Sequence, residues 1–138
     1  MVTGQDATAL IREAMPLCAT LGVRAEKYTA EEVVLALDWA PGLCTTGGIL
    51  HGGVVMAVAD SAGAACAFLN LPKDASATAT IESKTNFLGA VRSGSVVATA
   101  TPLHAGATTI VVETAVRDSS GRLVAKVTQT QMVLRSRS

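Results

Sequence analysis

Two groups that could act together on a carbonyl compound stand eight residues apart in one apolar stretch, Thr45 to Leu69. His51-Gly52-Gly53 lies near its start, and Asp60 is the only carboxylate, Lys or Arg within it. Glycines at the start of a helix permit close backbone approach, and the free amides there favour a developing anion. A carboxyl group in apolar surroundings has a raised pKa and can serve as a general base or as a nucleophile.

The same stretch predicts a long α-helix, because it is rich in Ala, Val, Met and Leu and has no Pro. It is apolar on all sides, so we expect it to be buried all round. Gly52 and Asp60 would then lie about 12 Å apart along the axis. One carbonyl carbon cannot meet both groups of one helix, so a shared site needs two copies in a symmetric dimer. The structural alternative is that the glycines only form a tight helix entry and Asp60 bonds a neighbouring backbone group.

Composition limits the class of protein. The 138 residues predict a single domain, 1–138, whose core is aliphatic because only 3% of residues are aromatic. Eleven basic and 11 acidic residues leave no electrostatic footprint for nucleic acid or an anionic membrane. The apolar run is shorter than the ~20 residues of a membrane span and carries an acid. We expect a cytoplasmic protein, since no export signal is visible and the cysteines match no metal or redox spacing; these are Cys18, Cys44 and Cys66.

The rest of the chain predicts the elements that position these groups. An amphipathic helix is expected over residues 6–21, kinked or shortened by Pro16 and ended by Gly22. Strands are expected over residues 23–28, 31–39, 77–87, 94–104, 108–118 and 123–134, with a turn at 119–121. Residues 1–4 and 135–138 are expected to be loose. The order predicts an α+β domain in which an antiparallel sheet wraps around one long central helix. Such a sheet covers one side of that helix, so the other side needs the N-terminal helix or a second subunit.

At this point the residues resemble a known family. His-Gly-Gly, six residues, Asp60 in an Ala-rich helix, a strand ending in T-N-F-L-G-A and then R-S-G are similar to the hotdog-fold thioesterases. The likeness covers residues 15 to 134 and is greatest to the PaaI-like (phenylacetate-pathway) branch, whose relatives include 4-hydroxybenzoyl-CoA thioesterases. It implies a hotdog fold, homodimers that often pair into homotetramers, and hydrolysis of acyl-CoA without a metal. The resemblance implies no cofactor other than the coenzyme A of the substrate.

The resemblance also implies roles for single residues. Asp60 matches the catalytic carboxylate, Gly52 the glycine whose amide polarises the thioester carbonyl, and His51 the histidine that braces that turn. Thr45 stands where the family commonly has Asn or Gln to orient the water or thioester. Thr80 matches a Ser/Thr position that helps to hold the nucleophilic water.

Further residues are candidates for substrate binding. Gly53 follows Gly52 at the helix entry, and Arg92 and the turn containing Thr108 are candidate contacts for the phosphates of coenzyme A. The few aromatic residues predict an acyl pocket of aliphatic and small side chains, which suits an aryl ring or a medium acyl chain; examples are Val54, Met56 and Leu88.

Several alternatives stay open. Asp60 either deprotonates an attacking water or attacks the carbonyl itself. The absence of G-x-S-x-G disfavours a serine esterase. Two other functions are a hotdog dehydratase or hydratase, in which His51 and Asp60 move a proton on an acyl chain, and a non-catalytic acyl-CoA-binding protein.

Overall fold

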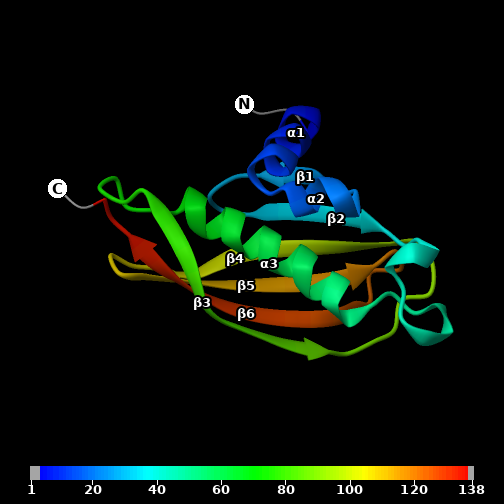
Figure 1. Ribbon diagram of the computed structural model, residues 1–138. Coiled ribbons are helices and arrows are strands. Elements are labelled where there is room, and N and C mark those ends of the chain that lie inside the picture. The colour runs from blue at the N-terminus through cyan, green and yellow to red at the C-terminus, as the bar shows by residue number, and fades with distance from the viewer. Residues whose placement is uncertain (1–3, 137–138) are drawn as a thin grey trace.

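One long helix lies across a face of a six-stranded antiparallel sheet (Figure 1). The computed structural model describes residues 4–136. Its helices are α1 (Gly4–Ala14), α2 (Pro16–Leu21) and α3 (Gly52–Leu69), with short 3₁₀ turns at Pro41–Leu43 and Thr46–Gly48. Its strands are β1 (Arg24–Tyr28), β2 (Val33–Asp38), β3 (Ala77–Phe87), β4 (Ser95–Ala105), β5 (Thr109–Asp118) and β6 (Leu123–Leu134). This is the expected α+β hotdog arrangement with an additional N-terminal helical segment.

The N-terminal helix is two helices rather than one. Pro16 has no N–H to donate, so the chain breaks at Met15 and restarts with Pro16 at the start of α2. Gly22 ends α2 in the left-handed conformation, with φ of 77°.

The ends of the described chain are held in place. Gly4, expected to be loose, begins α1. Arg135, also expected to be loose, pairs with Asp74 at 2.7 Å. Of the other residues expected to be loose, 1–3 and 137–138 lie outside the described residues.

The strands follow the order β1-β2-β4-β5-β6-β3, and every neighbouring pair is antiparallel. The strand boundaries lie within two residues of those predicted from the sequence. β3 is an edge strand, since it pairs only with β6. Its register shifts between Thr80 and Glu82, so Ile81 is the extra residue of a β-bulge.

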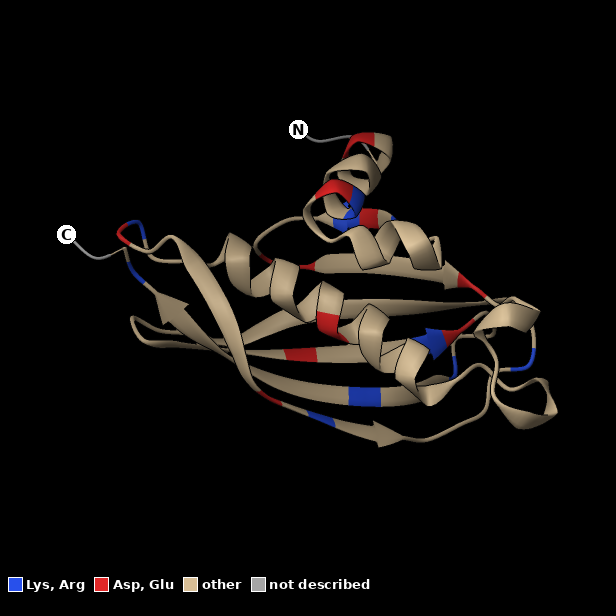
Figure 2. Cartoon of the chain, viewed as in Figure 1, with Lys and Arg blue, Asp and Glu red and all other residues tan. Residues whose placement is uncertain are grey.

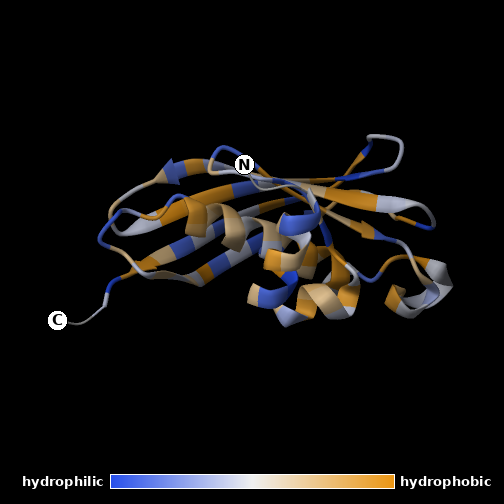
Figure 3. Cartoon of the chain, turned by 90° about the horizontal axis from the view of Figure 1, so that it is seen from above, coloured by the Kyte–Doolittle hydropathy of each residue, from blue (hydrophilic) through white to orange (hydrophobic). Residues whose placement is uncertain are grey.

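The core lies between α3 and the inner face of the sheet, and apolar segments gather along both (Figure 3). Residues of α3 that are fully buried include Val58, Ala59, Ala62 and Cys66. Burying one such valine contributes roughly 1.5–3 kcal/mol. By length and composition α3 could also cross a membrane, a test that buried core helices pass as well.

The expectation that α3 is buried all round is wrong for a single chain. Gly53, Met56, Asp60 and Phe68 are exposed along its outer side. Figure 2 shows one acidic residue near the middle of α3, and the sequence identifies it as Asp60. The sheet therefore covers one side of the helix and leaves the side that bears the carboxylate open.

Candidate functional site

The start of α3 presents one free backbone amide. His51 is the N-cap, with its backbone extended, and its Nδ1 accepts a hydrogen bond of 2.8 Å from the Gly53 N–H. Its carbonyl accepts from Val54 and Val55. Within residues 4–136 the Gly52 N–H has no hydrogen-bond partner. A free N–H at the positive end of a helix is suited to stabilise a negative oxygen.

Gly52 lines a cavity of about 340 Å³ together with Thr45. The ring of Phe87 lies against this glycine, because a Cβ there would be 3.2 Å from the ring carbons. The loop beside the cavity is fixed by Trp39, whose Nε1 donates to the Gly48 carbonyl at 3.0 Å. The structure thus brings two predicted site residues, Thr45 and Gly52, to one cavity.

Asp60 lines a different cavity, of about 290 Å³, with Gly53 and Ser83 among its neighbours. Its Oδ1 accepts a hydrogen bond of 2.6 Å from Nε2 of Gln129. Burial raises the pKa of the Asp60 carboxyl above its ordinary value, and the hydrogen bond from Gln129 opposes that rise. A carboxyl group with a raised pKa, next to open space, is suited to accept a proton.

Thr80 lies on β3 but not among the residues that line the Asp60 cavity. Its Oγ1 accepts a hydrogen bond of 2.6 Å from Nε2 of Gln131. The hydroxyl of β3 that lines the Asp60 cavity belongs to Ser83, which pairs with Gln129 across β3 and β6; Ser61 of α3 lines the cavity as well. The bulge at Ile81 allows both Thr80 and Ser83 to face α3, and a sequence with unbroken alternation would not place them so.

The two candidate contacts for coenzyme A lie at opposite ends of the sheet. Arg92 is exposed beside the first residues of β4, and among residues 4–136 it has no ion pair. Thr108 lies in the turn after β4, where its carbonyl accepts from Val133. An eleven-residue strand is roughly 33 Å long, so one compact group cannot contact both residues on one chain.

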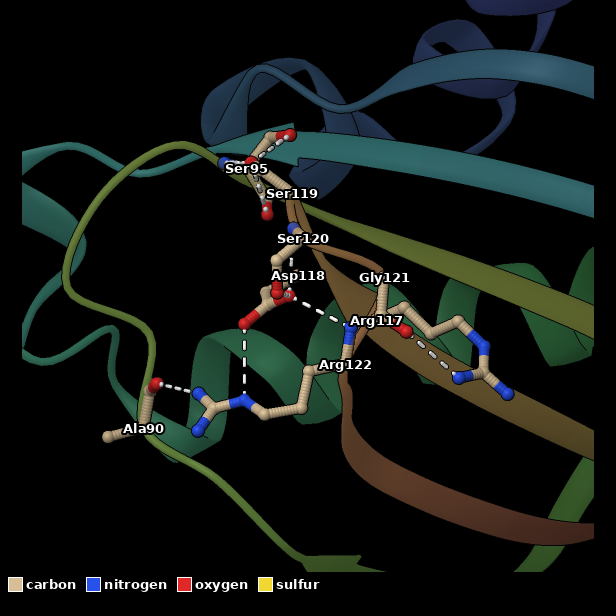
Figure 4. Close-up of polar contacts among 8 residues, drawn as sticks. All are labelled: Ala90, Ser95, Arg117, Asp118, Ser119, Ser120, Gly121 and Arg122. Carbon is tan, nitrogen blue, oxygen red and sulfur yellow. Dashed lines mark hydrogen bonds and ion pairs between the residues drawn. The ribbon is translucent and has the colours of Figure 1, made fainter.

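A second arginine lies near Arg92 but is already engaged. Arg122 Nε is 3.2 Å from Asp118 Oδ2, and its NH2 donates to the Ala90 carbonyl at 2.7 Å (Figure 4). Hydrogen bonds and the charge of Arg122 hold the pKa of the Asp118 carboxyl below its usual range, the largest effect coming from the Ser120 hydroxyl. Within residues 4–136, Arg92 therefore differs from Arg122 in having no protein anion against it.

Of the residues expected to line the acyl pocket, Met56 lies in the Asp60 cavity. Val54 is half-buried against the core, and Leu88 is exposed.

Among residues 4–136 no group of three or more His, Cys, Asp or Glu side chains could hold a metal ion. The three cysteines are free thiols. Burial raises the pKa of the Cys66 thiol to about 11, which disfavours the reactive thiolate. Cys44 Sγ donates to the Ala40 carbonyl at 3.3 Å.

Sequence reasoning missed Gln129 and Ser83, although β6 carries a signal for the first. Gln129 and Gln131 occupy inward positions between Val127 and Val133, where apolar residues are the rule. Polar residues at such positions need partners, and here the partners include Asp60.

Comparison with known proteins identifies the family of the chain. The model of the Thioesterase superfamily matches residues 47–125. ComA2, a candidate esterase of Bacillus subtilis, is 33% identical over 108 residues, covering 78% of this chain and 86% of its own. The structure of a candidate esterase from Mycobacterium tuberculosis superposes with a TM-score of 0.85 at 27% identity, covering 90% of this chain and 100% of that one.

A Thioesterase family protein from Silicibacter pomeroyi gives a TM-score of 0.84 at 29% identity, covering 94% of this chain and 96% of that one. The family model spans the free amide of Gly52 and the carboxylate of Asp60. The chain belongs to the Thioesterase superfamily.

Proposed function

We propose that this protein is an acyl-CoA thioesterase of the PaaI-like branch, acting on a hydrophobic aryl or medium-chain acyl group. One observation carries the proposal: the free Gly52 amide and the Asp60 carboxylate lie on one helix but line separate cavities. The two groups are complementary in chemistry, one for an oxyanion and one for a proton. They reach the same thioester when the amide comes from one subunit and the carboxylate from the other.

The open side of the single chain supports a homodimer. The outer side of α3 exposes Met56 and Phe68, and edge strand β3 exposes Ile81 and Phe87. A long edge strand with unpaired backbone groups is suited to pair with another chain. The outer face of the sheet exposes further large apolar residues, which supports pairing of dimers into a homotetramer; Met132 and Leu134 are examples.

The proposed reaction follows from these positions. The thioester carbonyl oxygen accepts a hydrogen bond from the Gly52 amide. In one route, Asp60 of the partner subunit takes a proton from water, which attacks the carbonyl carbon. The C–S bond then breaks, and coenzyme A leaves as the thiol after taking that proton. In the other route, Asp60 attacks to form an anhydride that water cleaves. Both routes give a carboxylic acid and coenzyme A.

The proposal includes binding and location. Arg92 is the candidate contact for a phosphate of coenzyme A, because it is exposed and has no ion pair within the described residues. Neither a metal nor a cofactor takes part, and nucleic acid and membranes are not partners. We place the protein in the cytoplasm, as its sequence predicts.

His51 favours hydrolysis over dehydration or hydration. Its Nδ1 is already engaged with the Gly53 N–H, which suits a residue that braces the turn. A dehydratase needs a histidine that reaches the substrate.

A panel of acyl-CoA thioesters tests the proposal, with free thiol and enoyl absorbance followed together. Thiol release with aryl or medium-chain substrates supports hydrolysis. A change in enoyl absorbance without thiol would assign a dehydratase or hydratase, and binding without either would assign a silent acyl-CoA-binding protein. Fastest turnover of acetyl-CoA would contradict the substrate class.

A further inference from the structure

Two glutamines lie on the inner face of β6 beneath α3. Gln129 is 0% exposed and Gln131 is 1% exposed. Burying an amide costs free energy unless its polar atoms are hydrogen-bonded. The contacts of these two side chains therefore indicate why polar residues occupy core positions.

Each glutamine donates to a different polar residue. Nε2 of Gln129 donates to Oδ1 of Asp60 at 2.6 Å, and Nε2 of Gln131 donates to Oγ1 of Thr80 at 2.6 Å. An ionised carboxylate can only accept hydrogen bonds, so the amide nitrogen of Gln129 must face Asp60. Oδ2 of Asp60 remains for the cavity.

The oxygen of the Gln129 amide, unlike its nitrogen, makes no hydrogen bond within residues 4–136. Among residues 4–136 its Oε1 is buried without a hydrogen-bond partner, as is Oγ1 of Thr114. The bond to Asp60 is therefore the only side-chain hydrogen bond of Gln129 within that range. The only hydrogen bond of this buried amide is the one to Asp60. Its position is therefore better explained by a role at Asp60 than by a gain in the stability of the fold.

Gly63 makes room for this arrangement. It is buried on α3, three residues after Asp60, and a Cβ there would meet Oε1 of Gln129 at 1.8 Å. Glycine inside a helix costs about 0.5–1 kcal/mol relative to alanine. A buried helical glycine at this position is needed for the amide to lie beneath the helix.

We propose that Gln129 is a positioning residue for Asp60. Its amide lies under α3 in the space left by the missing side chain of Gly63, and it fixes the carboxylate with Oδ2 facing the cavity. This inference rests on the proposed function, in which Asp60 is the base or nucleophile. The hydrogen bond also favours the ionised carboxylate, since it lowers the pKa of Asp60 against the effect of burial.

Among residues 4–136, no other charged side chain lines the cavity of Asp60. The other residues that line it are not titratable, and α2 has neither an acidic nor a basic residue. Glu82 and Lys84 of β3 face away from α3, because they alternate with Ser83. Lys126 of β6 pairs with Glu113 at 2.7 Å. The charged residues of α1 are absent from the cavity, and His51 lies roughly 13 Å away along the helix.

The test replaces Gln129 with methionine, which keeps the length and volume of the side chain but removes the donor. We expect kcat at neutral pH to fall by roughly tenfold to a hundredfold, the scale of a misplaced catalytic group, with KM unchanged. The acid limb of the kcat pH profile should move to higher pH, because the pKa of Asp60 rises without the hydrogen bond. Gln131→Met is the matched control: it loses an equally buried amide from the same strand, yet its acid limb should stay at the wild-type pH.

Two further measurements keep the inference testable. The ¹³C titration of the Asp60 carboxyl should give a higher pKa in Gln129→Met than in the wild type, and this readout does not depend on turnover. Gly63→Ala retains Gln129 but fills its gap, so it should shift the same pKa upward, and it serves if Gln129→Met does not fold. A folded Gln129→Met protein with the wild-type acid limb and the wild-type Asp60 pKa would overturn the inference. If the wild type hydrolyses no acyl-CoA, the proposed function fails, while the titration still decides whether Gln129 holds Asp60.

Discussion

Gly52 and Asp60 lie eight residues apart on α3, and they line different cavities of the same chain. The rise of 1.5 Å per residue separates them by about 12 Å along the axis. A site that uses both groups on one substrate therefore needs two copies of the helix.

Mixed dimers test this arrangement. Gly52→Pro removes the free amide, and Pro is tolerated in the first turn of a helix. His51 has φ −61° and ψ 132°, which suits the residue before proline, and the half-exposed Phe87 ring can move away from the new side chain. Dimers of Gly52→Pro alone and of Asp60→Asn alone should be nearly inactive. A doubly tagged mixed dimer should recover clear activity, because one of its two sites keeps both groups.

The control for this experiment is the fold of each species, followed by circular dichroism and gel filtration. A folded mixed dimer as inactive as its parents would refute the cross-subunit site.

Asp60→Asn should lower kcat by about 10²- to 10⁴-fold, the range of a lost general base. It should also raise stability at neutral pH. Since burial puts the pKa of Asp60 above the unfolded value of 3.8, its contribution to stability is fully present below pH 3.8 and is lost as pH rises through the folded pKa. Asn does not ionise. In urea unfolding, the free energy of unfolding of the variant should therefore rise relative to that of the wild type between low and neutral pH. A difference that does not change with pH would contradict the burial effect.

Single-turnover hydrolysis in ¹⁸O water tests the wild type for direct attack by Asp60. If Asp60 attacks and water then cleaves the anhydride at the Asp60 carbonyl, the first product molecule keeps one oxygen of Asp60 and the label enters the carboxylate. Attack by water on the thioester puts label in the product alone, as does cleavage of the anhydride at its acyl carbonyl. Mass spectrometry of product and protein detects the label, and label in Asp60 would exclude the route in which Asp60 is only a base.

Thr80→Val should destabilise the fold by about 1–3 kcal/mol, because it leaves the buried amide of Gln131 without its acceptor. Thr85→Val is the matched control on the same strand. Its Oγ1 is buried without a partner among the described residues, so its removal should be neutral or stabilising. If Thr80 holds the attacking water, its variant should also lose kcat more than it raises KM; a rise in KM alone would assign a binding or structural role.

His51→Ala removes the side-chain cap of α3 and should cost about 0.5–2 kcal/mol. It should lower kcat as well, because the turn that carries the Gly52 amide is no longer braced. His51→Asn supplies another capping oxygen and should restore most of the stability. Thermal unfolding and turnover of both variants check this; full activity in a folded His51→Ala protein would exclude the bracing role.

The composition and spacing of short segments were sufficient to predict all six strands and the central helix, because these signals are local. The break at Met15 also follows from Pro16. Gln129 and Ser83 were missed for a different reason. The bond from Gln129 joins residues 69 positions apart, so it depends on which strand lies beneath α3. Ser83 faces α3 beside Asp60 only because of the bulge at Ile81, which alternation alone does not predict. The sign of this contact in the sequence is the pair of glutamines at inward positions of β6. Their presence there is explained by the residues to which they donate, Asp60 and Thr80.

Because Ile81 is the extra residue of a bulge, its deletion would affect β3 differently from the deletion of any neighbouring residue. Thr80 pairs with Gln131 and Glu82 with Thr130, so the strands on both sides of Ile81 are already in step with β6. Deleting Ile81 would leave the paired residues of β3 with their present partners in β6, whereas a deletion elsewhere in β3 would turn the following side chains to the opposite face. Evolution or engineering can therefore shorten the strand by one codon at this site while preserving its pattern of inward and outward side chains.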